Sequence, residues 1–160
     1  MGVNSYIGLG ANLDNPIEQI KTAFIALDNL PKSILVSCSS LYTSEPMGEP
    51  NQQNYINAVA KLETALSPIK LLDYLQQIEN NQGRIRSSVR WSARTLDLDI
   101  LLFGNKNVKN ERLTIPHYGI KQRNFVVIPL AEIEPLLCLP DGSRIQDIKE
   151  QLGSQGIQKL

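Results

Sequence analysis

The spacing of hydrophobic residues differs between segments of the chain, and these differences predict the order of strands and helices. Apolar residues gather in short β-rich runs over some segments and recur every three to four positions over others. The predicted order is strand 5–9, helix 15–30, strand 34–42, strand 55–62, helix 67–82 and strand 96–103. This β-α-β-β-α-β order is typical of an α/β (α+β) fold with a ferredoxin-like antiparallel sheet and helices packed on one face.

Both predicted helices begin with recognisable signals. Asn15 can cap the first helix, Pro16 suits its first turn, and Glu18 stands where a capping-box acid belongs. Ser67 opens the second helix, and Gly83 lies just past its end. The weaker pattern beyond residue 115 predicts a C-terminal extension with a helix at 123–132 interrupted by a proline, a turn at 139–142 and a helix at 143–152.

Composition narrows the range of functions. A chain of 160 residues can bury a substantial core, and we expect one domain over residues 1–160. With 16 basic and 16 acidic residues the net charge is zero, which argues against general attraction to nucleic acid or an anionic membrane. Cys38 and Cys138 lack metal-ligand spacing, and no signal peptide or membrane-spanning run is visible. We therefore expect free thiols in a cytoplasmic protein.

Two aspartates stand in the clearest predicted strand. Because strand side chains alternate between faces, Asp97 and Asp99 should point the same way, with Cα atoms about 6 to 7 Å apart. Two carboxylates at that spacing can share or bracket Mg²⁺, which favours oxygen ligands. A solvated polar face would show the same pattern, but Leu101 and Phe103 continue this side and favour a site. The residues expected on the opposite, core-facing side are Leu96, Leu98, Ile100 and Leu102.

A dense group of arginines precedes the aspartates. Four of the seven arginines fall within eleven positions: Arg84, Arg86, Arg90 and Arg94. The planar guanidinium suits phosphate oxygens, although a charged surface loop would also explain the group. Trp91 within it could stack on a base or pack against the protein. Positive charge beside paired carboxylates points to phosphoryl transfer, which uses both together.

The single histidine is a weaker candidate. A lone histidine is more often structural than catalytic, but His117 has Tyr118 beside it and Arg112 and Arg123 near it in the sequence. These residues predict a second patch that contacts phosphate. Three further positions are core residues by pattern alone: Tyr55, Asn57 and Phe125.

Several enzyme classes are excluded by absent motifs. The sequence has no P-loop, no kinase glycine-rich loop with its HRD segment, and no GxSxG nucleophile elbow. A non-enzymatic alternative is RNA binding, because ferredoxin-like sheets with exposed aromatic residues can bind RNA. The aspartate pair and the zero net charge oppose that alternative.

An ordered set of motifs resembles a known family. The segment RWSARTLDLDI at 90–100 closely resembles the signature of the 6-hydroxymethyl-7,8-dihydropterin pyrophosphokinases. Further motifs in the family's order are GANL at 10–13, YTSEPMG at 42–48, YIN at 55–57, GRIR at 83–86 and PHY at 116–118. The resemblance implies a ferredoxin-like α/β fold. It also implies transfer of the pyrophosphoryl group of ATP to the hydroxymethyl group of the pterin, with release of AMP, in folate biosynthesis.

The resemblance also implies residue roles. Asp97 and Asp99 would hold two Mg²⁺ ions on the triphosphate, while Arg84 and Arg94 would stabilise charge during transfer. Alignment and charge neutralisation should dominate, and no general base is nominated. The residues implied on the ATP side are Gln76, Arg86, Arg90, Trp91, Arg112, His117, Tyr118 and Arg123. Those implied on the pterin side are Ser44 and Met47 through backbone groups, Asn57 at the amide edge, and Tyr55 and Phe125 on the two ring faces.

The chain departs from the family pattern at two places. Ser92 and Ala93 replace the usual Gly-Pro pair, so the freedom of a loop expected to close over the nucleotide should differ. Ser87 stands where some members carry lysine, which removes one expected phosphate contact. A kinase of another heterocycle stays open as an alternative. We expect a monomer that binds ATP and the pterin, and neither nucleic acid nor a membrane.

Overall fold

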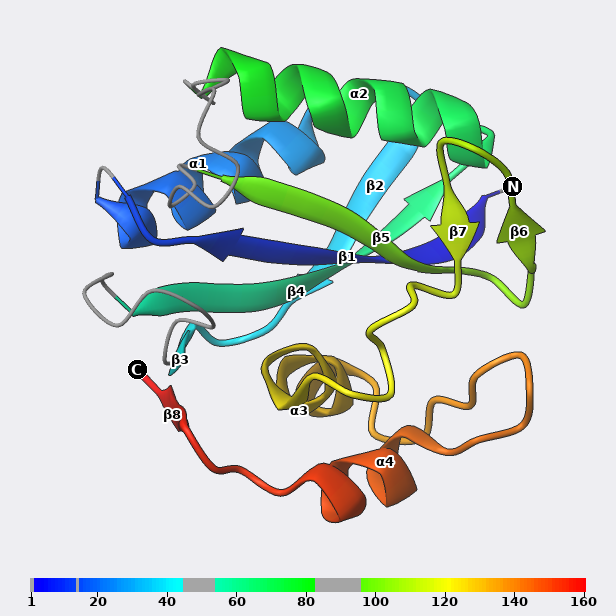
Figure 1. The fold of residues 1–160 in the computed structure, drawn as a ribbon. Helices are drawn as coiled ribbons and strands as arrows, with labels where there is room; N and C mark the ends of the chain where they lie inside the picture. Colours follow the sequence, from blue (N-terminus) through cyan, green and yellow to red (C-terminus); the bar gives the residue numbers. More distant parts are fainter. Residues whose placement is uncertain (1, 14, 45–53, 83–95) are drawn as a thin grey trace.

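An antiparallel sheet forms the centre of the computed structural model, which describes residues 2–13, 15–44, 54–82 and 96–160 (Figure 1). Within these residues the sheet has six strands, which run in the order β5-β1-β4-β3-β8, with β2 paired to the other half of β4. Their bounds are β1 (Val3–Ala11), β2 (Ser33–Cys38), β3 (Tyr42–Ser44), β4 (Tyr55–Thr64), β5 (Asp97–Phe103) and β8 (Ile157–Lys159).

Helices cover both faces of the sheet. Figure 1 shows α1 (Pro16–Asp28) and α2 (Pro68–Asn81) on one face and α3 (Asn124–Ile133) and α4 (Ile145–Leu152) on the other. The prediction that the two helices of the β-α-β-β-α-β order pack on one face is confirmed, and the C-terminal pair, for which no face was predicted, covers the other face. Residues 56–60 in the middle of β4 are all buried, as expected of a strand covered on both sides.

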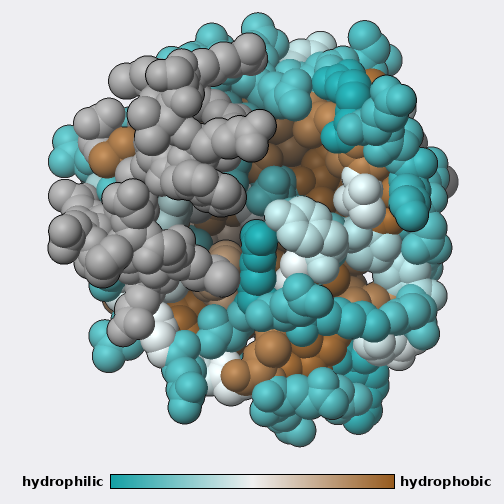
Figure 2. All heavy atoms as spheres, viewed as in Figure 1, coloured by the Kyte–Doolittle hydropathy of each residue, from teal (hydrophilic) through white to brown (hydrophobic). Residues whose placement is uncertain are grey.

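Two hydrophobic cores follow from this arrangement. Leu27 of α1 and Leu75 of α2 are fully buried in the core on the first face, and Leu130 of α3 and Ile145 of α4 in the core on the second. Burying each such side chain contributes about 1.5 to 3 kcal/mol. Among the residues that Figure 2 colours by hydropathy, polar ones predominate, with smaller apolar areas between them. Among the described residues, no helix is both long and apolar enough to cross a bilayer.

The helix-start predictions have different outcomes. The Ser67 hydroxyl accepts a hydrogen bond from the Lys70 backbone N–H at 3.2 Å, which confirms the cap of α2. Asn15 has a left-handed backbone (φ 60°, ψ 69°) and makes no side-chain cap, so that prediction is wrong. A capping side chain reaches the first turn from an extended backbone, which Asn15 lacks. The predicted third helix forms and runs through Pro129 without interruption.

The strand predicted at 34–42 is divided into β2 and β3. Both pair with β4, and between them Ser39 bonds Val59 twice, through its backbone N–H at 2.8 Å and its hydroxyl at 2.9 Å. The short strands β8, β6 (Val108–Lys109) and β7 (Thr114–Ile115) were not predicted, because two or three residues carry no detectable period. Cys38 and Cys138 are free, as expected.

A bulge in β5 changes its predicted side-chain pattern. The pairing with β1 shifts between Tyr6 and Ile7, which leaves Leu101 as an extra residue in β5. Beyond it the faces exchange: Leu102 packs in the second core and Phe103 in the first, opposite to the prediction. The prediction is confirmed for the core-facing residues before the bulge, which are Leu96, Leu98 and Ile100.

Candidate active site

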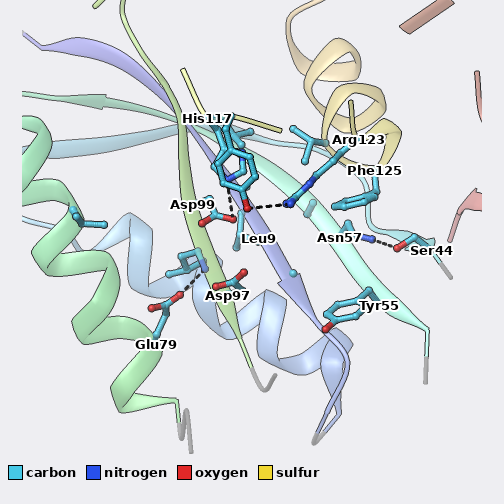
Figure 3. A pocket seen from close by; sticks show the side chains of 18 of the residues that line it. Leu9, Ser44, Tyr55, Asn57, Glu79, Asp97, Asp99, His117, Arg123 and Phe125 are labelled. Carbon is cyan, nitrogen blue, oxygen red and sulfur yellow. Dashed lines mark hydrogen bonds and ion pairs between the residues drawn. The ribbon is translucent and has the colours of Figure 1, made fainter. Parts of the chain in front are cut away.

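A pocket of about 610 Å³ opens beside β5 and β1, between α2 and the start of α3 (Figure 3). Every predicted site residue that the structure describes lines it: Ser44, Tyr55, Asn57, Gln76, Asp97, Asp99, Arg112, His117, Tyr118, Arg123 and Phe125. The remaining predicted site residues lie outside the described residues: Met47, Arg84, Arg86, Arg90, Trp91 and Arg94. Segments far apart in the sequence therefore meet at one place.

The aspartates face a glycine pair across the sheet. Asp97 is the Cα partner of Gly10 in β1, and Asp99 is the partner of Gly8. Directly opposite residues project to the same face, so both aspartates line the pocket while β1 adds no side chain beside them. A Cβ placed on Gly10 would lie 3.5 Å from Asn57 Oδ1. The pocket floor is thus open between Asp97 and Asn57.

Glu79 supports this part of β5 from α2. Its side chain is buried, with the residue only 3% exposed, and Oε2 accepts a hydrogen bond from the Leu98 backbone N–H at 2.8 Å. Among the described strands, β5 lies at the edge of the sheet, so a backbone N–H that points away from β1 has no neighbouring strand to accept it. Glu79 supplies the acceptor for the Leu98 N–H. Sequence reasoning missed Glu79, although a charged residue at the apolar spacing of a predicted helix was a usable signal.

His117 lies over Asp99, with Nε2 at 3.8 Å from Oδ2 (Figure 3). The Gly119 backbone N–H donates to Nδ1 at 3.0 Å, which assigns the proton of the neutral ring to Nε2. Burial lowers the pKa of His117, and the nearby Arg123 lowers it further, against the opposing effect of Asp97. The ring is therefore neutral near pH 7 and presents an N–H toward the aspartates.

An aromatic and cationic stack continues from His117. The rings of His117 and Tyr118 are stacked with centroids 4.4 Å apart. Arg123 Nη2 donates to the Tyr118 hydroxyl at 3.2 Å, and its guanidinium lies 5.2 Å from the Tyr118 ring and 5.8 Å from the Phe125 ring. Tyr118 is 71% exposed, so a planar ligand can reach it.

Arg112 reaches the pocket from the segment between β6 and β7. Its Nη2 donates to Asp73 Oδ1 at 2.7 Å and to Gln76 Oε1 at 3.3 Å, both on α2. The structure thus brings together two residues predicted for the ATP side. At this end of the pocket lie the two aspartates and the residues predicted for the ATP side. We call this set the charged half of the pocket: Gln76, Asp97, Asp99, Arg112, His117, Tyr118 and Arg123.

The other end of the pocket is uncharged. Asn57 Nδ2 donates to Ser44 Oγ at 2.6 Å, and both residues are buried. In the view of Figure 3, Phe125 and Tyr55 lie on either side of this pair. Tyr55 and Phe125 are half-buried and line the pocket, so they are not the simple core residues that their pattern suggested. We call these four residues the neutral half: Ser44, Tyr55, Asn57 and Phe125.

The described part of the chain contains no cluster of three or more metal-binding side chains. It offers instead the two carboxylates of Asp97 and Asp99 on one side of a strand. Mg²⁺ commonly binds through one or two carboxylates while phosphates and water complete its shell. The donor set therefore fits a magnesium ion that arrives with a phosphate ligand.

Comparison with known proteins identifies the family. A family model described as "7,8-dihydro-6-hydroxymethylpterin-pyrophosphokinase (HPPK)" matches residues 6–135. The chain belongs to the HPPK family. Among HPPK relatives, the 2-amino-4-hydroxy-6-hydroxymethyldihydropteridine pyrophosphokinase of Haemophilus influenzae is 51% identical over 158 residues, covering 99% of this chain and 98% of that protein. The enzyme of the same name from Pseudomonas aeruginosa is 47% identical, with 97% and 95% covered.

Solved structures confirm the fold class. A crystal structure of HPPK-DHPS in complex with substrates matches with a TM-score of 0.76 at 12% identity, over 99% of this chain and 46% of that chain. A Plasmodium falciparum HPPK-DHPS matches with a TM-score of 0.75 at 16% identity, over 99% and 49%. The chain thus spans about half the length of these HPPK-DHPS chains. At such identities the likeness concerns the fold alone.

Proposed function

We propose that the chain transfers the pyrophosphoryl group of ATP to 6-hydroxymethyl-7,8-dihydropterin and releases AMP, a step of folate biosynthesis, and that the pocket is its active site. One observation carries the proposal: residues from five of the six motifs of an HPPK sequence meet in one pocket with a charged and a neutral half, and the sixth motif, at 83–86, lies outside the described residues. A polyanion and a flat neutral heterocycle need such a division.

The charged half suits the triphosphate. Asp97 and Asp99 would hold two Mg²⁺ ions, which neutralise phosphate charge when bound. His117 presents its N–H, while Arg112 adds a guanidinium group from beside α2 and Arg123 adds one from beside Tyr118 and Phe125. Within the same proposal, Gln76 and Tyr118 contact the nucleotide.

Further residues of the ATP side belong to the proposal, although they lie outside the described residues. Arg84 and Arg94 would stabilise charge on the phosphates during transfer, as their guanidinium groups suit phosphate oxygens. The residues proposed to close over the nucleotide are Arg86, Arg90 and Trp91.

The reaction itself asks for alignment more than for covalent help. The hydroxymethyl oxygen of the pterin forms a bond to the β-phosphorus while the bond from that phosphorus to the α-phosphate oxygen breaks. AMP leaves with that oxygen, and the hydroxyl proton passes to solvent. A pocket that holds both substrates at fixed places supplies the alignment, and its charges stabilise the transferring group.

The neutral half suits the pterin ring. Tyr55 and Phe125 would pack on its two faces, since aromatic rings stack well on flat heterocycles. Asn57 gives one amide hydrogen to Ser44, and its Oδ1 faces β1 near Gly10, where it can accept from an N–H of the ring. Backbone groups near Ser44 and Met47 would complete the contacts, with Met47 outside the described residues.

We also propose that residues 1–160 form one domain that acts as a monomer in the cytoplasm, without nucleic-acid or membrane partners. The zero net charge supports the last part, because binding to such polyanions usually uses a basic surface.

The deciding experiment measures AMP formation with ATP, 6-hydroxymethyl-7,8-dihydropterin and Mg²⁺, with and without EDTA. We expect AMP in equal amount to pyrophosphorylated pterin, and none of either with EDTA. Other heterocycles with a hydroxymethyl group serve as controls, and a better substrate among them would overturn the pterin assignment. Salt-sensitive binding of single-stranded RNA without AMP formation would favour the RNA-binding alternative.

A further inference from the structure

A carboxylate at the far end of α3 holds the segment that leads into β3. Glu132 Oε1 accepts a hydrogen bond from the Tyr42 hydroxyl at 2.6 Å. Both its oxygens lie 3.1 Å from the Ser40 backbone N–H, and Oε2 accepts from the Ser40 hydroxyl at 2.9 Å. One carboxylate thus receives three donors from two residues. None of these three residues lines the pocket as described.

The elements joined by this contact are the two sides of the neutral half. Tyr42 is the first residue of β3 and Ser44 is the last, and Ser44 holds the Asn57 amide. Tyr42 is also the Cα partner of Asn57 across the pairing with β4. On the opposite side, Phe125 lies in the first turn of α3, the helix that ends beside Glu132. The contact therefore links α3 to β3.

The charge states favour a strong link at neutral pH. Tyr42 is buried, and both burial and its bond to Glu132 raise the pKa of its hydroxyl. Desolvation alone would raise the pKa of Glu132, but the hydrogen bonds from Tyr42 and Ser40 outweigh it and lower that pKa. A charged acceptor with a neutral hydroxyl donor makes a short and strong hydrogen bond.

A second carboxylate at the same helix end provides a comparison. Glu134, the residue that caps α3, accepts a hydrogen bond from Lys61 of β4 and lies beside the buried Tyr6 of β1. Like Glu132, Glu134 links α3 to a strand of the sheet and interacts with a tyrosine side chain. Lys61 and Tyr6 are partners in the β1–β4 pairing, and each lies four residues along its strand from the partners Asn57 and Gly10. Glu134 therefore anchors α3 away from the neutral half.

We propose that Glu132 is a positioning residue for the pterin. It fixes β3, which carries Ser44, against α3, which carries Phe125, and so sets the width of the neutral half without touching the ligand. The inference rests on the proposed function of the pocket and adds a residue to it. Neither the motifs nor the pocket lining includes Glu132.

The test compares Glu132→Gln and Tyr42→Phe with the matched control Glu134→Gln. The readouts are KM for the pterin and for ATP, kcat, pterin Kd by titration calorimetry, and Tm. Because a hydrogen bond to a charged group is lost, we expect the first two variants to raise pterin KM and Kd about tenfold. ATP KM and kcat at saturation should stay within about twofold of wild type, since the charged half is untouched. Glu134→Gln should lower Tm and leave pterin affinity unchanged.

The outcomes separate this inference from the proposed function. Wild-type protein that forms no AMP and binds no pterin contradicts the function itself. A working wild type whose pterin KM responds equally to Glu132→Gln and Glu134→Gln contradicts the positioning role, and so does a parallel rise in ATP KM. If Glu132→Gln fails to fold, Tyr42→Phe decides alone, because it removes one hydroxyl and keeps the carboxylate.

Discussion

The two halves of the pocket differ in how their polar groups are arranged before a ligand binds. In the charged half the side chains of Asp99 and Arg112 are 41% and 47% exposed, so their charges face water. In the neutral half Asn57 and Ser44 are only 5% and 6% exposed and are hydrogen-bonded to each other. The charged half therefore keeps its charges in contact with solvent, whereas the polar groups of the neutral half are held in place before a ligand binds.

This difference indicates two ways of recognising a substrate. Exposed charges attract metal ions and phosphates at a distance, and their effect is screened by salt. A buried, internally bonded pair changes little on binding, so less ordering opposes association. We therefore expect the charged half to be sensitive to charge and ionic strength, and the neutral half to be sensitive to shape.

The largest expected effect comes from removing one charge of the aspartate pair. Asp99→Asn keeps the size of the side chain but weakens its interaction with Mg²⁺, so several kcal/mol of charge stabilisation should be lost. We expect kcat/KM to fall about a thousandfold with little change in Tm. Steady-state assays over a range of Mg²⁺ measure this effect.

A matched control is Asp147→Asn, which breaks an ion pair with Arg144 on the surface of α4. It should leave kcat/KM unchanged. If Asp99→Asn kept near-wild-type turnover at saturating Mg²⁺, the charged half would not be a metal site.

Shape in the neutral half is tested next by Phe125→Ala. Removing one aromatic face should raise pterin KM about tenfold to a hundredfold, because stacking on a heterocycle contributes about 1 to 3 kcal/mol. ATP KM should hardly change. The control is Phe24→Ala in α1, a partly buried residue of the first core, which should lower Tm without affecting either KM. Equal rises in both KM values for Phe125→Ala would remove the distinction between the halves.

The boundary between the halves is tested by Gly10→Ala. The added Cβ meets only ordinary contact with Asn57 Oδ1, and alanine restricts the unfolded chain, so stability should rise by about 0.5 kcal/mol. The same methyl group enters the open floor between Asp97 and Asn57. We expect kcat/KM to fall about tenfold, from the loss of about 1.4 kcal/mol of transition-state binding. A more stable variant with full activity would show that ligands do not use this floor.

Ionic strength should produce the smallest effect. Raising salt from about 0.05 M to about 0.5 M shortens the screening length and should raise ATP KM about threefold at fixed free Mg²⁺. Pterin KM should stay nearly constant over the same range, since the neutral half has no charge to screen. Steady-state kinetics at saturating partner substrate measure both values. A salt dependence shared by the two substrates would contradict the proposed division.

Local pattern was sufficient for much of the fold. The period-two and helical runs predicted β1, β4, β5, α1 and α2, because side-chain periodicity is a property of each segment alone. It failed where long-range packing decides. The C-terminal helices cover the second face of the sheet, and β8 pairs with β3 from the other end of the chain. Neither the packing of these helices nor the pairing of β8 can be deduced from the local sequence of the segments involved.

The site shows the same limit. Asp97 and Asp99 share a side because two residues of a strand always do, so the sequence by itself determined that pair. Only the tertiary structure placed His117 over Asp99 and set the Asn57–Ser44 pair opposite Phe125, since these contacts join separate elements. Glu79 and Glu132 belong to no motif, and their roles follow from the hydrogen bonds that they accept from residues outside their own helices. The chemistry could be inferred from residue types in order, whereas positioning depended on contacts that periodicity does not encode.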